Sequence, residues 1–166
     1  MNLKRILEKS GLVKGREYDI QEHHVTDDGR RLQPDVVVHL PDEKRLIIDS
    51  KVSLTAYERC TSADSKEGRL QAMKQHMASL RSHVKGLSSK NYQKLYGGSS
   101  PDFVLMFVPI ESAFGLALQH DTNLYYEAFE KNIVIVSPST LLATLAPSDS
   151  VWKQEYQNKN AMEIAE

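Results

Sequence analysis

Hydrophobic and polar positions along the chain change their period several times, and each change predicts a different element. Two runs rich in β-branched residues, DVVVHL (35–40) and RLIIDSKV (45–52), flank the segment PDEK. That segment has the length and composition of a tight turn, so the two runs predict an antiparallel hairpin. Upstream, apolar residues at helical spacing predict a short opening helix that ends at Gly11 or Gly15. Between the two, YDIQEHHV followed by TDDGR predicts a strand and an Asp-Gly turn.

The second half of the chain begins with a regular apolar stripe. Its steps of three and four predict one long amphipathic helix from about Ser65 to Leu87, packed against a sheet or a partner helix. The stripe consists of Leu70, Met73, Met77, Leu80, Val84 and Leu87. DFVLMFVPI and IVIVSP are continuous apolar runs, typical of central strands covered on both faces. Further helices are predicted at 111–120, at 123–132, after an N-cap at Ser139 or Thr140, and in the polar segment 149–166.

The order of these elements predicts an α/β (α+β) fold. We expect a mixed central sheet of about five strands, flanked by helices on both faces. A chain of 166 residues has the size of one ordinary domain, here 1–166. The last helix carries no stop signal, so we expect the chain to be a piece of a longer protein.

Composition narrows the class of protein. The net charge is −1 and no run of 18 apolar residues occurs, so neither a transmembrane span nor a secretory leader is expected. The single cysteine, Cys60, has no partner for an internal disulfide, which is typical of a reducing compartment. The histidines are scattered without the spacing of a zinc site. We therefore expect a soluble cytoplasmic chain that makes no membrane contact and binds no small-molecule cofactor.

One stretch is strongly basic although the whole chain is nearly neutral. From Arg69 to Ser100 there are six Lys or Arg and no Asp or Glu. This pattern makes the stretch a candidate surface for a polyanion. The alternative is a solvated helix face whose charge is balanced by acidic neighbours in the fold.

Candidate chemistry gathers at one end of the predicted hairpin. Asp49 and Lys51 lie on the same face of their predicted strand. If the two strands pair across PDEK so that the numbers of facing residues add up to roughly 85, Asp35 lies opposite Ser50, one step from Asp49. Two carboxylates this close repel unless a cation lies between them, and Mg2+ prefers such oxygen ligands. A metal there could activate a water for attack on a phosphodiester, with Lys51 assisting. The alternative is a surface salt bridge between Lys51 and either aspartate.

Several blocks of the sequence together resemble the RmuC family, bacterial proteins associated with DNA recombination. They are QPDVVVHLPDEKRLIIDSKVSLTAYERC, DFVLMFVPIESAF, NIVIVSPSTLLATL and VWKQEYQNKNA. The likeness runs from about Leu3 to Ala161. It implies a nuclease domain of the PD-(D/E)xK superfamily, with a restriction-endonuclease-like core in the order helix, three strands, helix, strand. Members of that family are longer chains with a membrane anchor and a coiled coil, so the resemblance implies that the parent protein is membrane-anchored.

The resemblance also implies roles for individual residues. Pro34-Asp35 matches the PD of the motif and Asp49-Ser50-Lys51 matches its (D/E)xK. Asp35, Asp49 and the Ser50 carbonyl would then hold the metal, and Lys51 would be the catalytic lysine. The superfamily often adds a glutamate from the opening helix, for which Glu8 is the first choice and Glu17 the second. The segment TLLATLAPSDSVW departs from the family by its Pro147, which leaves the docking of the last helix open.

The function that this resemblance implies is metal-dependent hydrolysis of DNA with Mg2+ or Mn2+. The basic helix would contact the DNA backbone through Lys74, Arg81, Lys85, Lys90 and Lys94. Two alternatives remain open: a non-catalytic DNA-binding domain of the same fold, and a structural or assembly module that uses helix 65–87. A homo-oligomer is compatible with all three.

Overall fold

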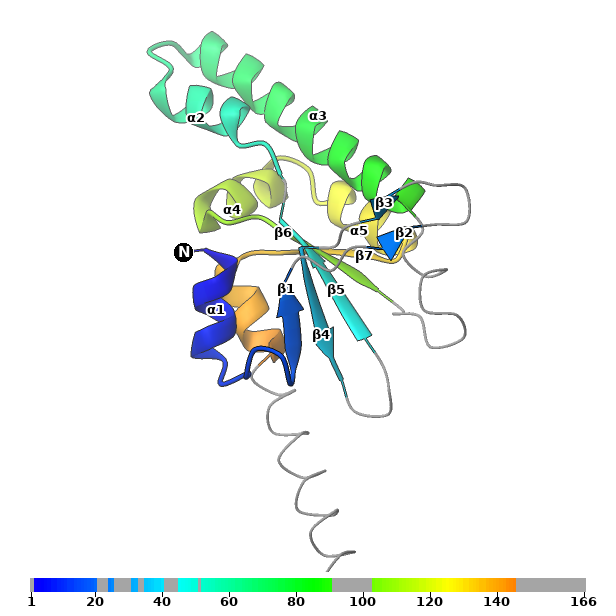
Figure 1. Cartoon of the computed structure of the whole chain (residues 1–166). Helices are drawn as coiled ribbons and strands as arrows, with labels where there is room; N and C mark the ends of the chain where they lie inside the picture. Colours follow the sequence, from blue (N-terminus) through cyan, green and yellow to red (C-terminus); the bar gives the residue numbers. More distant parts are fainter. Residues whose placement is uncertain are drawn as a thin grey trace, which may run out of the picture.

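A mixed five-stranded sheet forms the centre of the molecule (Figure 1). The structure, a computed structural model, describes residues 2–20, 24–25, 31–32, 35–40, 45–50, 52–90 and 103–145. The strand order is β1-β4-β5-β6-β7, with β1, β4 and β5 antiparallel and β5, β6 and β7 parallel. The bounds are Tyr18–Ile20 (β1), Val36–His39 (β4), Arg45–Asp49 (β5), Val104–Phe107 (β6) and Ile133–Val136 (β7). The predicted fold class is confirmed.

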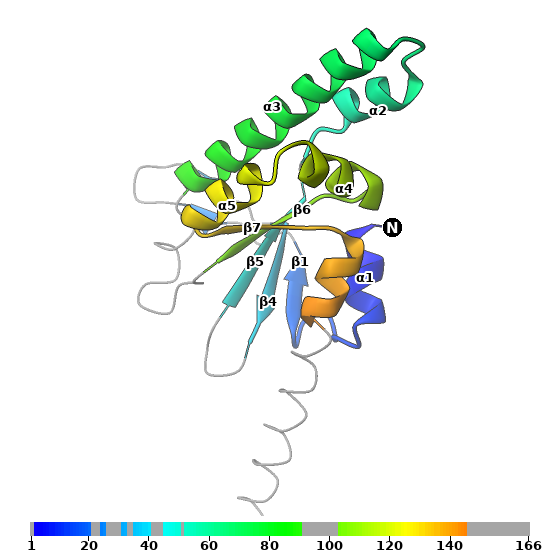
Figure 2. The ribbon, with the colours of Figure 1, turned by 180° about the vertical axis from the view of Figure 1, so that it is seen from behind.

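Helices cover both faces of this sheet, as expected (Figures 1 and 2). Alternate strand residues point to opposite faces, so each strand serves two cores. Val37 and Ile47 belong to the core under α2, α3, α4 and α5, whereas Val38 and Ile48 belong to the core under α1 and the helix at 138–145. The helix bounds are Leu3–Lys9 (α1), Thr55–Ser62 (α2), Lys66–Lys90 (α3), Glu111–His120 (α4) and Asn123–Glu130 (α5). Among the residues that the structure describes, no helix is both long and apolar enough to cross a membrane.

The opening helix α1 has recognisable caps at both ends. Asn2 is its N-cap, and the side chain accepts a hydrogen bond of 2.9 Å from the backbone N–H of Arg5. Gly11 follows the C-cap residue Ser10 with φ of 85°, a left-handed conformation that glycine adopts without strain. The predicted end at Gly11 is therefore confirmed.

The long helix α3 and its apolar stripe are also confirmed, with two corrections. Leu70 is 52% exposed, so the buried part of the stripe begins at Met73. Helix α2 was not predicted, because its sequence TAYERCTS is mostly polar and buries only Ala56 and Cys60. α2 packs along α3, and the pair projects from the sheet (Figure 1). Since the buried part of the stripe packs on the chain's own helices and sheet, it is not available to a partner helix.

The strand predicted at 18–25 is divided in two. β1 ends at Ile20, and β2 (His24–Val25) pairs with β3 (Arg31–Leu32) in a separate two-stranded sheet. The predicted Asp-Gly turn lies outside the described residues, as does the predicted helix at 149–166 with Pro147. β2 and β3 pair in antiparallel orientation, as predicted for a hairpin.

The helix at 138–145 begins earlier than predicted. Ser137 caps it, because the Thr140 backbone N–H donates to Ser137 Oγ at 3.4 Å and the Ser137 N–H donates to Thr140 Oγ1 at 2.7 Å. The predicted N-cap at Ser139 or Thr140 is wrong by two or three residues. The reason is Pro138, which fits the first helical position because its missing N–H needs no partner there.

Glu111, in the first turn of α4, ties that helix to the start of 138–145. Its carboxylate accepts a short hydrogen bond from the Ser139 backbone N–H. Burial alone would raise the pKa of Glu111, but hydrogen bonds from the Ser139 N–H and the Ser139 and Ser137 hydroxyls outweigh it, so the pKa lies below its ordinary value of 4.5. A depressed carboxyl pKa contributes stability that is present above the ordinary pKa and is lost as the pH falls through the folded value.

Glu111→Gln should therefore lower stability at pH 7, and the deficit should vanish in acid. Glutamine keeps an oxygen that can accept from Ser139, so the variant removes only the charge. Because Glu111 is exposed, the deficit should stay under about 1 kcal/mol after solvent screening. Melting temperatures of both proteins between pH 7 and pH 3 test this, with exposed Glu130→Gln as the control. A deficit that persists unchanged at pH 3 would contradict the role of the charge.

Candidate metal and nucleic-acid site

The candidate site lies where the parallel strands end. β5, β6 and β7 have their carboxyl ends at one edge of the sheet, the edge at which open α/β sheets bind ligands. Asp49 is the last residue of β5 and pairs with Met106 of β6. Its side chain points to the face that α3 covers and is 0% exposed. Aspartate is rarely fully buried, and a buried carboxylate at the end of a strand makes Asp49 a candidate functional residue.

Asp35 lies beside Asp49 on the neighbouring strand. The pairs of β4 and β5 end at Val36↔Ile48, whose numbers sum to 84, and one further step sets Asp35 opposite Asp49. The predicted register, with Asp35 opposite Ser50, is wrong by one residue, and the correction brings the two aspartates closer together. Asp35 Oδ2 accepts hydrogen bonds from the Ser50 backbone N–H at 2.7 Å and from Ser50 Oγ at 3.1 Å.

A third side chain reaches this site from α3. His83 Nε2 lies 3.2 Å from Asp49 Oδ1, and the His83 side chain is 19% exposed. The sequence did not single out His83, since it was only one of several scattered histidines. The structure therefore brings His83 of α3 to Asp49 of β5, beside Asp35, the residue that precedes β4.

The two glutamates considered for the site lie elsewhere. Burial, and then the charge of Glu8, raise the pKa of Tyr18, which places Glu8 near that tyrosine at the far end of β1 and β4. Glu17 accepts from the Val13 backbone N–H at 2.8 Å, and its own carbonyl accepts from His39, again at the far end of β4. Across the described part of the chain, no three His, Cys, Asp or Glu side chains form a group that could hold a metal ion.

The residues at hand nevertheless fit a hard cation. Mg2+ is commonly bound by one or two carboxylates and fills its remaining positions with waters and substrate phosphate oxygens. Asp35 and Asp49 supply two carboxylates on one face of adjacent strands, and the chemistry of these oxygen donors suits Mg2+ or Mn2+ better than softer metals. Lys51, the predicted catalytic lysine, lies outside the described residues.

The predicted basic surface on α3 is positively charged only in part, because acidic residues neutralise some of it. Lys74 and Lys85 are exposed on α3, whereas Arg81 binds Asp121 at 2.5 Å and Glu127 at 3.6 Å. Hydrogen bonds from the Asn123 N–H and from Arg81 lower the pKa of Asp121. Lys94 and the side chain of Lys90 lie outside the described part. For Arg81, the structure thus favours the alternative of charge balanced by acidic neighbours.

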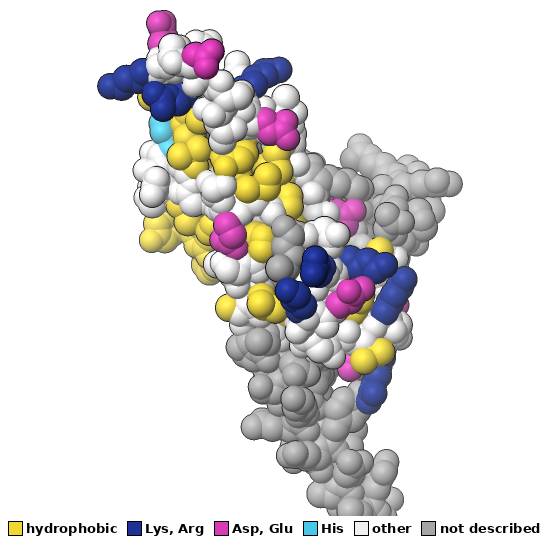
Figure 3. Space-filling view, turned by 90° about the vertical axis from the view of Figure 1, so that its left-hand side faces the viewer, with side chains coloured by type: hydrophobic (Ala, Val, Ile, Leu, Met, Phe, Trp, Pro, Cys, Tyr) yellow, Lys and Arg dark blue, Asp and Glu magenta, His cyan; other side chains and the backbone are white. Residues whose placement is uncertain are grey.

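Charges are also mixed at the outer end of the α2–α3 pair. Figure 3 shows blue and magenta side chains side by side at the top of the molecule, the end at which α2 and α3 meet in Figure 1. The exposed charged residues of this segment are Glu58, Arg59, Asp64, Lys66, Glu67 and Arg69. A DNA surface on α3 is therefore better sought beyond this end, where Lys74 and Lys85 are exposed.

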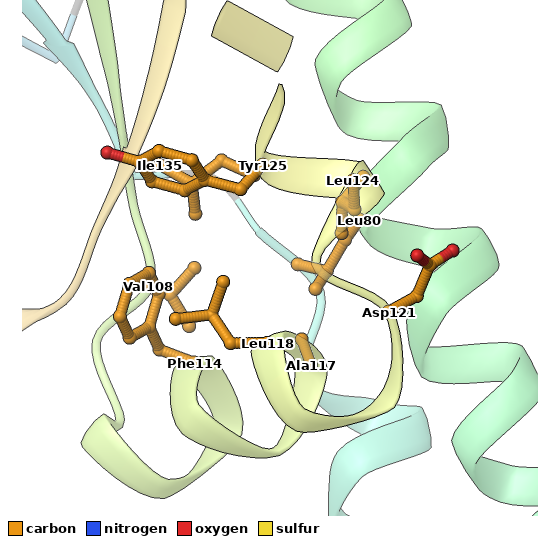
Figure 4. Close-up of a pocket in the computed structure, with 9 residues that line it drawn as sticks. All are labelled: Leu80, Val108, Phe114, Ala117, Leu118, Asp121, Leu124, Tyr125 and Ile135. Carbon is orange, nitrogen blue, oxygen red and sulfur yellow. The ribbon is translucent and has the colours of Figure 1, made fainter. Parts of the chain in front are cut away.

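A small pocket between α3, α4, α5 and the sheet does not compete with this site (Figure 4). Leu118, Phe114 and Val108 point into it, while the Asp121 carboxylate turns toward α3. Its volume of about 10 Å³ is the space of roughly one water molecule, too small for a substrate. A second, open groove lies at the carboxyl ends of β6 and β7, lined by Pro109, Ile110, Glu111, Pro138, Ser139 and Leu142.

Comparison with known proteins identifies the family. The profile described as "RmuC family" matches residues 1–166, the whole chain. The chain belongs to the RmuC family. It is 57% identical over 164 residues to a DNA recombination protein RmuC homolog of Pseudomonas aeruginosa, and 52% identical over 170 residues to one of Neisseria meningitidis serogroup A. It is 45% identical over 164 residues to the DNA recombination protein RmuC of Escherichia coli K12.

These RmuC relatives are much longer than the chain. The alignments cover 99%, 100% and 99% of this chain but only 36%, 29% and 34% of the three relatives. The chain thus corresponds to about a third of an RmuC protein. The predicted membership in the RmuC family is confirmed for this chain.

Proposed function

We propose that this RmuC-family chain is a metal-dependent deoxyribonuclease domain that acts in DNA recombination. The observation that carries the proposal is Asp49, a fully buried carboxylate at the carboxyl end of β5, beside Asp35 and in contact with His83. Two neighbouring carboxylates repel each other, and a cation bound between them relieves that repulsion. The names of the relatives support DNA as the substrate.

In this proposal, each residue has a distinct task. Asp35 and Asp49 would hold Mg2+ or Mn2+, with the Ser50 carbonyl as a third ligand. The Ser50 N–H and hydroxyl orient Asp35 through their two hydrogen bonds to Oδ2. When bound, the metal would polarise the phosphodiester and lower the pKa of a water ligand. Lys51 would stabilise the charge that develops on the phosphate.

Incubation of the chain with linear, nicked and circular DNA tests the proposal. We expect cleavage with Mg2+ or Mn2+ and none with EDTA. DNA binding without cleavage in either metal would instead favour a non-catalytic DNA-binding domain. Failure to bind DNA or metal would leave an assembly module.

The proposed DNA surface on α3 predicts a specific salt dependence. Lys74→Gln and Lys85→Gln each remove an exposed positive charge. If each lysine contacts a phosphate, each variant should reduce the slope of log K against log salt by about 1, because one fewer counterion is released on binding. Fluorescence anisotropy with a labelled duplex between 50 and 200 mM salt, roughly the range over which such losses develop, measures both slopes.

Lys4→Gln is the matched control for these two variants. Lys4 is exposed on α1, which covers the opposite face of the sheet. Its removal should leave the slope unchanged. Equal slopes for Lys4→Gln, Lys74→Gln and Lys85→Gln would show that α3 does not provide the phosphate contacts.

A further inference from the structure

The contact between α3 and the end of β5 is the basis of this inference. His83 Nε2 and Asp49 Oδ1 are 3.2 Å apart, and the two residues are 34 positions apart in the sequence. Asp49 is fully buried, so its carboxylate orientation is set by the protein and not by solvent. His83 is the described α3 side chain that bonds to it.

The direction of this hydrogen bond follows from the chemistry of its partners. An ionised carboxylate has only acceptor atoms, so the bond requires a proton on His83 Nε2. Oδ1 accepts this hydrogen bond, which fixes the rotation of the carboxylate about the Cβ–Cγ bond. A cation would then be held by a carboxylate whose orientation the protein has already set.

The neighbours of His83 hold its ring at the site. His83 lies beside the buried stripe residues Leu80, Val84 and Leu87, which fasten this part of α3 to the sheet. Two residues before His83, about half a turn away, Arg81 binds Asp121 and Glu127 and so fixes the other side of the helix. The imidazole is therefore carried by a helix that packing and ion pairs hold in place, a requirement for a precise supporting contact.

We propose that His83 is a positioning residue for the metal site: its Nε2–H holds Asp49 in the orientation that binds the cation. This rests on the proposed function, since it assumes that Asp49 is a metal ligand. Removing a residue that supports a metal ligand typically weakens metal binding by about 10- to 100-fold. His83 does not touch the substrate in this scheme.

Three substitutions of His83 separate positioning from simple packing. In His83→Gln, the amide nitrogen stands near the place of Nε2 and can still donate to Asp49. In His83→Asn, the amide stands near the place of Nδ1 and is too short to reach. His83→Ala removes the donor altogether. His120→Ala, at the exposed end of α4, controls for the loss of a histidine.

The readout is Mn2+ affinity, measured by calorimetric titration of each folded variant without DNA. Circular dichroism at the same temperature confirms that each variant is folded. We expect His83→Ala and His83→Asn to weaken Mn2+ binding by about 10- to 100-fold. His83→Gln should stay within a few fold of the unmutated chain, and His120→Ala should match it.

The outcomes distinguish the two proposals. Affinities unchanged in His83→Ala, or equal in His83→Gln and His83→Asn, would overturn the positioning role while leaving the nuclease proposal intact. Asp49→Asn in the same titration tests the site itself. If it binds Mn2+ as well as the unmutated chain, or if the unmutated chain binds none, the metal site is wrong and both proposals fall.

Discussion

Asp49→Asn should reduce DNA cleavage by on the order of 10³-fold while leaving the chain folded. Asparagine has the size of aspartate and keeps an oxygen that can accept from His83 Nε2. What it loses is the negative charge, and with it the attraction for a divalent cation. Since several kcal/mol of metal assistance to the transition state would disappear, the rate should fall by the stated factor.

The same substitution should cost little stability. Burying an ionised carboxylate is unfavourable, and a neutral residue of equal shape that still accepts from His83 avoids that cost. We expect the melting temperature to move by only a few degrees. A structural ion pair predicts the opposite: cleavage would persist and stability would fall.

Cleavage rates with saturating Mn2+ and thermal melts of the same samples check this prediction. Asp64→Asn is the control, because Asp64 is exposed between α2 and α3, away from the end of β5. It should leave the cleavage rate unchanged. Full activity in Asp49→Asn would remove Asp49 from the active site, whatever its effect on stability.

The regular elements of this fold could be predicted because their signals are local. A short stretch of sequence is enough to recognise the β-branched runs of β4 and β5 and the apolar stripe from Met73 to Leu87. Helix α2 carries no such signal, because it buries only Ala56 and Cys60 against α3. Short polar elements of this kind depend on a neighbour that the local sequence does not reveal.

The register of the central hairpin was missed by one residue for a physical reason. Alternation of buried and exposed residues normally fixes the register of a strand. Here Val36, Val37 and Val38 are all buried, because helices cover both faces of the sheet. Because neither face of the strand is exposed, no alternation of buried and exposed residues marks the register. Residue spacing alone cannot decide whether the numbers of facing residues add up to 84 or to 85.

The partners of the site could be predicted only in part. Asp35, Ser50 and Asp49 are close in sequence, and a hairpin brings them together. His83 reaches Asp49 through the packing of α3 on the sheet, which the sequence does not state. One signal was present: His76 and His83 are seven residues apart, two helical turns, and both flank the apolar stripe. Polar residues repeated beside a buried stripe are candidates for interior contacts.

His76→Ala should destabilise the chain by about 2–4 kcal/mol. His76 is fully buried, its Nε2 donates to the Ala113 carbonyl of α4 at 3.0 Å, and its ring lies 5.7 Å from that of Tyr57 in α2. The substitution opens a cavity and removes the hydrogen bond, and the two losses add. At roughly 2–4 °C per kcal/mol for a chain of this size, the melting temperature should fall visibly.

Two comparison variants make this result specific. His76→Leu fills most of the space but cannot donate, so it should lose only the hydrogen bond, about 1 kcal/mol. His120→Ala, at an exposed position, should stay within about 0.5 kcal/mol of the unmutated chain. Urea melts of the three variants give these differences directly. A large loss in His76→Ala would show that His76 helps to attach α3, the helix that also carries His83, to α2 and α4. No loss would show that the apolar stripe alone holds the helix.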